Sequence, residues 1–431
     1  MAPDAASKAI DAGLVASLRG LDRDGRLLFT TRVLRMFGYG FLAIVLVLYL
    51  AGLGLDSLTI GLILTLTLVG DTLVSLWLTT HADRIGRRRV LIAGSLLMVG
   101  AGVVFVLASW VPLLILAATI GVISPTGNEV GPFLAVEQSA LTEATPATRR
   151  TQIFAWYNLA GYVATAVGAL SAGLTSQALI GAGIAAVDAY RVIVIGYAFV
   201  GLAMAAVFLR VGPAVEQSVA AVVGDGIKRR LGLGPSKGIV ARLSFLFAID
   251  SFAGGFIPQS LMAFWFHLKF GVQPAVLGAI FFGGNLLAAA SSLYAPRIAA
   301  RIGLINTMVA THLPSNVLLI LVPFMPNLPL AIGVLLLRYT LSQMDVPTRQ
   351  SYVMAVVEPN ERSAAAGVTG IARTTGAAIS PALSAPLIAN AALTGLPFVI
   401  AGALKIVYDL ALWRAFKAQP APDERAGRGL A

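Results

Sequence analysis

Six of the charged residues that stand within otherwise apolar stretches of sequence are candidates for function. They are Asp71, Glu129, Asp250, Asp345, Arg349 and Arg373. An ionised group held away from water is costly unless it is paired, so each of these residues needs a counter-charge or a function. A carboxyl group in apolar surroundings can take up and release a proton near neutral pH, and a guanidinium group can bind an anion through paired hydrogen bonds.

Two of the acids belong to different halves of the chain and are the first candidates for proton exchange. Asp71 follows Gly70, whose missing side chain permits close packing of helices. Asp250 precedes a pair of glycines, Gly254 and Gly255. We expect the two carboxyl groups to face one central cavity. The alternative is that each acid is held in a buried ion pair or by a Ser or Thr hydroxyl group.

The remaining candidates are interpreted as a gate or a binding site near the inner ends of two helices. Asp345 and Arg349 are one helical turn apart, and Glu129 lies in the corresponding region of the first half. Arg373 would either keep an acid ionised or bind an anionic substrate. The alternative for the first three is that they are interfacial charges whose side chains reach water.

Three further polar positions receive structural interpretations. Lys405 and Asp409 are four residues apart on one helical face, so they are predicted to pair with each other. Arg35 is predicted to reach the cytoplasmic headgroups, and the alternative is that it reaches the cavity. His312 is interpreted as a hydrogen-bonded packing residue rather than as a proton switch.

The apolar stretches themselves require a membrane. The chain has 431 residues, of which 58% are hydrophobic and 12% charged, whereas a soluble domain carries about 25% charged residues. Runs of about 20 apolar residues cross a bilayer as helices, because lipid offers backbone groups no hydrogen-bond partners. The sequence therefore predicts an all-α membrane protein with twelve spans. These are 29–52, 58–80, 90–109, 112–135, 152–175, 190–210, 241–266, 275–297, 304–323, 329–350, 364–388 and 395–416.

The distribution of charge predicts how the chain lies in the membrane. The net charge is +11, but the basic residues are dispersed among the spans, which argues against a nucleic-acid partner. Nearly all of them fall in the tails and in alternate loops, so both termini are expected in the cytoplasm. The protein is expected to lie in the plasma (inner) membrane as a monomer. The absence of cysteine excludes disulfides and thiolate metal sites. The expected organisation is a tail over 1–28, a six-helix bundle over 29–210, a central loop over 211–240, a second bundle over 241–416 and a tail over 417–431.

Short sequence matches relate the two halves. ADRIG at 82–86 returns as AARIG at 299–303, and QSALTEATPATRRTQ at 138–152 resembles QSYVMAVVEPNERSA at 350–364. Both pairs follow even-numbered spans and have nearly the same offset. The repeat predicts two pseudo-symmetric six-helix bundles with a pathway between them.

The loop after the second span carries the most specific motif. It reads TTHADRIGRRRVL and resembles the signature of the major facilitator superfamily, Gly-x-x-x-Asp-(Arg/Lys)-x-Gly-x-(Arg/Lys)-(Arg/Lys). Thr79 takes the place of the first glycine. The matching residues are Asp83, Arg84, Gly86, Arg88 and Arg89. Twelve spans, a basic central loop and a repeat of six plus six resemble the same family.

The resemblance implies a secondary transporter that works by alternating access, and it implies a latch. In this family the signature aspartate closes the inner face at the start of span eleven, which here is the small-residue stretch 363–367. Asp83 would contact the helix N-terminus there, where free N–H groups carry partial positive charge. Ala300 stands at the equivalent place in the second half, so the latch is one-sided. The alternative is that Asp83 only neutralises neighbouring arginines.

The sequence contains none of the common enzyme motifs: no G-x-S-x-G, no phosphate-binding loop and no HExxH. No cofactor or metal is therefore predicted, and transport would draw on a proton gradient. The predicted function is proton-coupled export of a small molecule, as in an efflux branch, because a weakly polar pathway with aromatic residues suits amphiphilic or uncharged cargo. The alternatives are proton-coupled uptake of a small metabolite and a non-transporting membrane sensor or lipid-handling protein on the same fold.

Overall fold

The computed structural model describes residues 21–144, 150–212, 234–358 and 361–419, and within these ranges the regular elements are all helices. Nine helical segments in them are long and apolar enough to cross a membrane. Three predicted spans are not among these nine. Span eleven is the helix α15 (Arg362–Ala389), which carries more polar residues, and spans four and ten are each divided into a pair of shorter helices. The twelve predicted spans are thus present in the predicted order.

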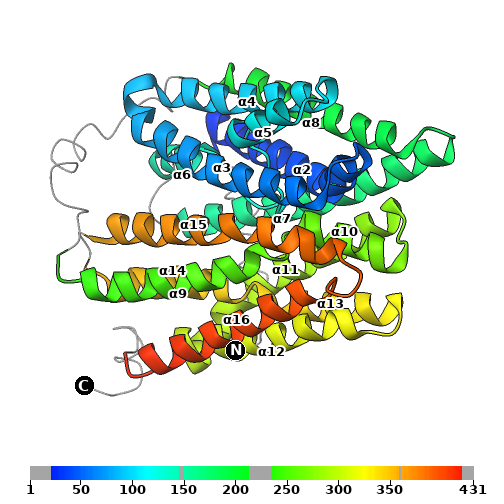
Figure 1. Cartoon of the computed structure of the whole chain (residues 1–431). Coiled ribbons are helices and arrows are strands. Elements are labelled where there is room, and N and C mark those ends of the chain that lie inside the picture. Colours follow the sequence, from blue (N-terminus) through cyan, green and yellow to red (C-terminus); the bar gives the residue numbers. More distant parts are fainter. Residues whose placement is uncertain (1–20, 145–149, 213–233, 359–360, 420–431) are drawn as a thin grey trace, which may run out of the picture.

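Figure 1 shows the chain as two groups of helices, one above the other. The first group contains α2 (Arg23–Gly52), α3 (Ser57–Ile85), α4 (Arg87–Leu107), α5 (Val111–Ile120), α6 (Phe133–Ala144), α7 (Arg150–Gly181) and α8 (Ala186–Phe208). The second contains α9 (Lys237–Gly255), α10 (Gln259–Phe270), α11 (Pro274–Ile302), α12 (Leu304–Leu321) with the short η4 (Val322–Phe324), α13 (Leu328–Ser342), α14 (Asp345–Val356), α15 (Arg362–Ala389) and α16 (Leu396–Phe416). Span four is α5 with α6, span seven is α9 with α10, and span ten is α13 with α14.

The two groups repeat the same close helix contact. A Cβ atom at Gly40 would lie 2.1 Å from the carbonyl oxygen of Thr165, so α2 meets α7 backbone to backbone. A Cβ atom at Gly255 would lie 2.4 Å from the carbonyl oxygen of Ala377, which joins α9 to α15 in the same way. Because only glycine permits such an approach, the two contacts identify equivalent positions in the two bundles.

The sequence repeat at the ends of spans two and eight also corresponds to one structure. Gly86 ends α3 with φ +101°, and Gly303 ends α11 with φ +90°. L-residues with a side chain rarely adopt this backbone conformation, whereas glycine adopts it at little cost. Each glycine turns the chain directly into the next helix, which explains why the tight ADRIG and AARIG junctions are alike. The predicted pair of pseudo-symmetric bundles is confirmed.

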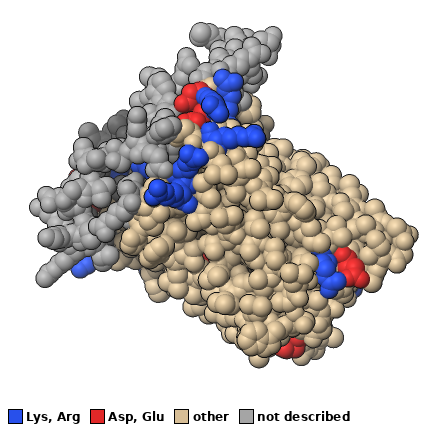
Figure 2. Space-filling view, turned by 90° about the horizontal axis from the view of Figure 1, so that it is seen from above, with Lys and Arg blue, Asp and Glu red and all other residues tan. Residues whose placement is uncertain are grey.

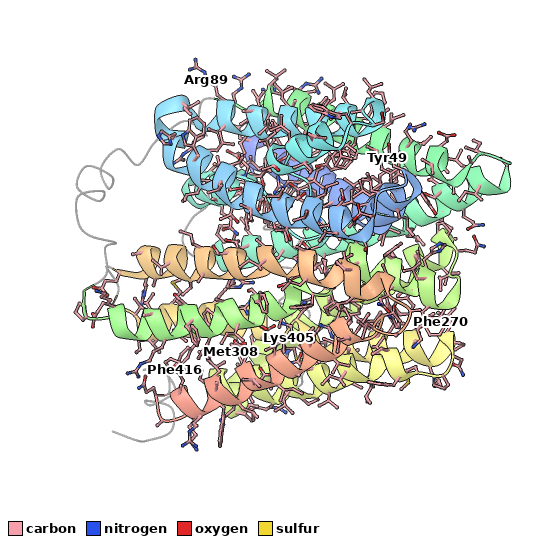
Figure 3. The ribbon with its side chains drawn as sticks, in the orientation of Figure 1. Tyr49, Arg89, Phe270, Met308, Lys405 and Phe416 are labelled. Carbon is pink, nitrogen blue, oxygen red and sulfur yellow. The ribbon has the colours of Figure 1, made fainter. Side chains whose placement is uncertain are left out.

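The ends of the helices define two ends of the molecule. The terminal end carries the beginning of α2, the end of α8, the beginning of α9 and the end of α16; the far end carries the connections at 53–56, 108–110, 182–185, 271–273 and 390–395. Figure 2 shows most of the Lys and Arg on the face that it draws toward one end, with a smaller basic group beside acidic residues at the opposite end and other residues over most of the remainder. Figure 3 places Arg89 and Phe416 at the terminal end, with Lys405 between the two ends.

The bundles touch each other in their far halves. A Cβ atom at Gly173 near the far end of α7 would lie 2.4 Å from the carbonyl oxygen of Pro274 at the start of α11. The backbone N–H of Ala382 in α15 donates a hydrogen bond of 3.0 Å to Thr65 Oγ1 in α3. A Cβ atom at Gly61, one turn before Thr65, would lie 2.8 Å from the carbonyl oxygen of Pro381 in α15. Helix α2 also contacts α10.

The same helix faces are exposed in the terminal half. Leu76 lies three turns beyond Thr65 on α3, and Ile371 lies three turns before Ala382 on α15. Their exposed fractions are 44% and 45%, and Asn158 on α7 is exposed as well. The bundles are therefore closed against each other at the far end and separated at the terminal end.

Candidate functional site

Span four is broken at its centre. The sequence predicted one apolar span over 112–135, but α5 ends at Ile120 and α6 begins at Phe133, so the prediction of a continuous span is wrong. The segment 121–132 between them contains Pro125, Gly131 and Pro132, which disfavour helix, and it carries Val122 at a φ of +54°. The span then continues through α6 to Ala144.

Side chains of neighbouring helices satisfy the backbone of this unwound segment. Tyr197 donates a hydrogen bond of 2.9 Å to the carbonyl of Val122, and Tyr39 donates one of 3.0 Å to the carbonyl of Val130. Lipid offers no such partners, so a break at membrane depth has to be enclosed by protein or line a cavity. In membrane transporters, broken helices of this kind commonly mark the binding site.

Asp71 lies at the middle of α3 and binds the unwound segment directly. It accepts a hydrogen bond of 2.5 Å from the backbone N–H of Gly131 and one of 3.1 Å from Ser75 Oγ. Gly70, just before it, brings α3 against the backbone of Thr119 in α5. Asp71 forms no ion pair with any residue in the described part of the chain, and it contacts neither Asp250 nor another acid there. The two carboxyl groups that we expected to face one cavity have different surroundings.

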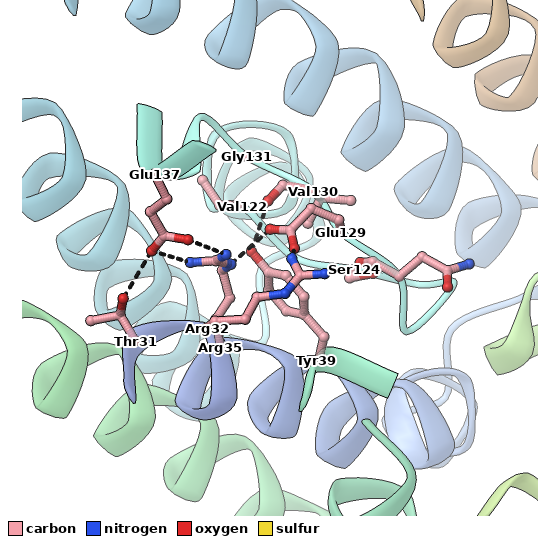
Figure 4. Close-up of polar contacts among 12 residues, drawn as sticks. Thr31, Arg32, Arg35, Tyr39, Val122, Ser124, Glu129, Val130, Gly131 and Glu137 are labelled. Atoms are coloured by element: carbon pink, nitrogen blue, oxygen red, sulfur yellow. Dashed lines mark hydrogen bonds and ion pairs between the residues drawn. The ribbon is translucent and has the colours of Figure 1, made fainter. Parts of the chain in front are cut away.

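The first bundle contains a buried charge cluster, shown in Figure 4. Arg35 has no exposed surface and donates to both oxygens of Glu137 over 2.8 and 2.7 Å, and to Glu129 over 2.7 Å. Arg32 pairs with the second oxygen of Glu129, and Tyr157 donates to Glu137. The prediction that Arg35 reaches headgroups is wrong, because its two counter-ions lie inside the bundle.

Sequence reasoning missed Glu137 altogether. The predicted end of span four at 135 left Glu137 in a loop, whereas α6 buries it completely. A usable signal was present: Glu137 directly precedes the Gln-Ser pair that begins one copy of the 138–152 repeat, and Arg349 directly precedes the other. A charged residue at the same position of both copies indicates a place in the structure that needs charge.

The second bundle contains a larger charge cluster. Lys405 of α16 donates to Asp250 of α9 over 2.5 Å, and Arg349 of α14 donates to Asp250 over 3.3 Å and to Asp345 over 3.0 Å. The predicted pair of Lys405 with Asp409 does not form. Asp409 instead accepts a hydrogen bond from Asn316, and its other oxygen is 2.8 Å from His312 Nδ1. Asp250 thus has the buried ion pairs that were the alternative to proton exchange.

The two clusters are equivalent in position but opposite in sign. Arg35 lies five residues before Gly40, and Asp250 lies five residues before the equivalent Gly255. Their partners, Glu137 and Arg349, precede the two copies of the Gln-Ser repeat. In each bundle, then, the first helix is bound to the fourth by a buried ion pair, with the acid and the base exchanged between bundles.

Among the described residues, no ion pair joins the two clusters, but one tyrosine is close to both. Tyr162 of α7 is within electrostatic range of Arg32 on one side and of Asp345 and Arg349 on the other. The predicted gate residues Glu129, Asp345 and Arg349 are therefore not joined: Glu129 is bound within its own bundle, as the other two are within theirs. Arg373 lies close to Arg349.

Two arginines of the signature loop donate hydrogen bonds to backbone carbonyl groups at helix ends. Arg88 donates to the carbonyl of Phe208 over 3.1 Å and also to that of Leu209, so it caps the end of α8. Arg89 donates to the carbonyl of Ile85 over 3.4 Å. The side chains of Asp83 and Arg84 lie outside the part that the structure describes.

Comparisons with known proteins agree with this architecture. Residues 28–381 match the sequence model of the Major Facilitator Superfamily. A protein of Saccharomyces cerevisiae, named Uncharacterized membrane protein YJR124C, is 30% identical over 418 residues, which are 90% of this chain and 93% of that protein. The nucleoside transporter NupG superposes with a TM-score of 0.70 at 14% identity, over 92% of this chain and 100% of its own. A D-xylose-proton symporter superposes with a TM-score of 0.70 at 15% identity, over 90% and 97%.

Proposed function

The chain belongs to the major facilitator superfamily, and from this premise we propose that it exports a small organic solute by alternating access, in exchange for a proton. It is a membrane transporter rather than an enzyme. In this proposal it works as a monomer in the plasma membrane, with the terminal end in the cytoplasm, because the basic residues gather there. The solute binds between the two charge clusters, near Tyr162.

The observation that carries the proposal is the position of Asp71. It is a carboxyl group at the centre of a span, bound by an N–H group and a hydroxyl group but by no cation within the described residues. Asp250 and Glu137, in contrast, are each bound by cationic side chains in buried ion pairs. Asp71 is therefore the acid best suited to bind and release a proton.

The unwound segment provides a route from Asp71 to the opposite bundle. Gly131 donates to Asp71, and six residues earlier the carbonyl of Pro125 accepts a hydrogen bond of 3.1 Å from the backbone N–H of Ser260 at the start of α10. A carboxylate accepts a hydrogen bond more strongly than a neutral acid does. Proton binding to Asp71 would loosen the segment and, through it, the contact between the bundles at the far end.

Two cysteines on one face of α15 can test this coupling in a chain that has none of its own. Ile371→Cys reports on the terminal half, and Ala385→Cys, at a position now exposed by 2%, reports on the far half. Each labelling rate with a water-soluble maleimide is divided by the rate of the same cysteine in the unfolded chain at the same pH, because only the thiolate reacts and its fraction falls with pH. We expect this relative rate to rise at position 385 and to fall at position 371 as pH is lowered from about 8 to about 5. Asp71→Asn, which imitates the protonated acid, should give the low-pH labelling at every pH.

Asp56→Asn is the matched control on the same helix. Asp56 caps the beginning of α3, and hydrogen bonds from Thr59 hold the pKa of Asp56 below its usual value, so it remains ionised over the whole range tested. Its replacement should leave the pH response intact. A response that survives in Asp71→Asn would assign the proton to another group, and labelling without any pH response would contradict proton coupling.

The direction of transport can be tested without knowing the solute. A sensitive host that expresses the chain is grown on a panel of toxic organic compounds, with Asp71→Asn as the inactive control. Export predicts resistance to at least one compound, because the host's cytoplasmic concentration of that compound falls. Hypersensitivity that requires Asp71 would instead establish uptake by symport.

We further propose that the signature loop closes the terminal end in the opposite state, through Asp83 and the start of α15. In the state described, no described atom lies within 4 Å of the position that a Cβ atom at Gly367 would take. This part of α15 is therefore open to receive a contact when the terminal halves approach each other.

A further inference from the structure

Two arginines of the second bundle lack counter-ions. Arg338 in α13 is exposed by only 8%, and its Nε atom has no hydrogen-bond partner. Arg373 in α15 is half-buried, and its Nε atom is also without a partner. Neither side chain forms an ion pair within the described ranges of the chain. A guanidinium group removed from water is costly unless an anion compensates it.

The neighbouring carboxylates are already engaged. Both arginines are within electrostatic range of Asp250 and Asp345. However, Asp250 is bound by Lys405 and Arg349, and Asp345 is bound by Arg349. Without counting His312, the cluster has more cations than acids: Arg338, Arg349, Arg373 and Lys405 against Asp250, Asp345 and Asp409.

The first bundle has no such excess. Arg32 and Arg35 are matched there by Glu129 and Glu137. The unbalanced positive charge is thus confined to the second bundle, on one side of the central region.

An anion can reach Arg373 from the terminal end. Gly370 lies three residues before Arg373 on α15, and no described atom lies within 4 Å of the position of a Cβ atom there. Ile371 is exposed by 45% on the adjoining surface. The helix therefore borders open space immediately beside the arginine, on the side where the bundles are separated.

We propose that Arg373 binds the oxyanion group of the transported solute, which is an organic anion carrying a carboxylate or a phosphate group, and that Arg338 adds positive charge from within the same cluster. The inference rests on the proposed transport function and names its substrate class. Guanidinium groups match such oxyanions through parallel N–H donors, and the bound charge would neutralise the cluster. An apolar body on the solute remains compatible with the exposed Leu76 and Ile371, so the expected amphiphilic cargo gains a negative headgroup.

The test is thermal unfolding of the purified full chain in detergent, with increasing concentrations of either sodium phosphate or sodium benzoate. Sodium chloride keeps the ionic strength constant, which removes general screening as an explanation. We expect at least one of the two anions to raise the unfolding midpoint, and the more effective one identifies the preferred headgroup. Arg373→Gln should need at least tenfold more anion for the same rise, and Arg338→Gln, which lowers the positive charge of the cluster, should need more anion than the native chain.

Two control variants make the result specific. Arg191→Gln removes an arginine that pairs with Asp188 at the far end, and it should respond like the native chain. Arg373→Lys keeps the charge but loses the fork of donors, so it should bind more weakly than the native chain and more strongly than Arg373→Gln. If the Arg338→Gln variant does not fold, the Arg373→Gln variant still tests the proposal, because Arg373 is only half-buried.

The proposal is overturned if neither anion stabilises the native chain, or if both glutamine variants respond as the native chain does. The second outcome would mean that anions act on the protein surface in general, as strongly hydrated salts do. Binding in detergent does not require transport. If the cysteines on α15 respond to pH but the anions do not bind, the substrate class is wrong while the transport mechanism stands.

Discussion

Replacing Arg35 with glutamine is expected to lower the free energy of unfolding by about 3–5 kcal/mol. The change leaves Glu137, a carboxylate with no exposed surface, without the two guanidinium hydrogen bonds that neutralise it. Tyr157 and Thr31 would still donate to Glu137, but neutral hydroxyl groups do not replace a counter-charge. The measurement is the unfolding of the purified protein in detergent, followed by tryptophan fluorescence.

A double variant separates the loss of charge pairing from the loss of packing. Arg35→Gln combined with Glu137→Gln removes both charges, and we expect it to recover most of the stability that the single change loses. Arg191→Gln, which breaks an exposed ion pair, should cost less than about 1 kcal/mol. If the double variant is as unstable as the two single variants added together, the ion pair is not the source of the effect.

Replacing Asp250 with asparagine is expected to be similarly severe, at about 3–5 kcal/mol. Lys405 would lose its counter-charge at 2.5 Å, because an amide oxygen can accept a hydrogen bond but carries no net charge, and Arg349 would keep only Asp345 as an ion-pair partner. Both cations are buried, so neither can turn to water for compensation. The unfolding midpoint and the monodisperse fraction in size-exclusion chromatography both report the loss.

Replacing Lys405, the cation that Asp250→Asn leaves without its acid, should restore the stability. Asp250→Asn with Lys405→Met places an apolar side chain of similar length in the bundle, and it should regain most of the lost stability. Lys405→Met alone leaves Asp250 with Arg349 and should be intermediate. An Asp250→Asn variant as stable as the native chain would show that the cluster tolerates its excess of positive charge.

Local sequence patterns were sufficient to predict the course of the chain through the membrane. Each apolar run corresponds to a span because the bilayer imposes one length and one hydrogen-bonding requirement on every crossing. The ADRIG and AARIG repeats identified equivalent junctions because Gly86 and Gly303 both have a positive φ, which glycine adopts at little cost. The same residue type therefore stands at both junctions. These features depend on near neighbours in the sequence.

Contacts between distant helices were not predictable in the same way. Hydropathy did not reveal the break in span four, because the residues around Pro125 and Pro132 are apolar enough to resemble a continuous span. Helical spacing suggested that Lys405 would pair with Asp409, yet the partner of Lys405 lies 155 residues away. Which of two acids neutralises a buried cation depends on how helices pack, and spacing within one helix does not contain that information.

The exchange of acid and base between the two halves has a consequence for biogenesis. A duplicated architecture risks misassembly, because α2 and α9 have similar shapes and each could dock against the wrong fourth span as the chain enters the bilayer. Arg35 beside Arg349 would bring two cations together in lipid, and Asp250 beside Glu137 would bring two anions together. Both crossed pairings bring like charges together and are therefore unfavourable. The orientation of one ion pair thus favours packing of each first span against the fourth span of its own half.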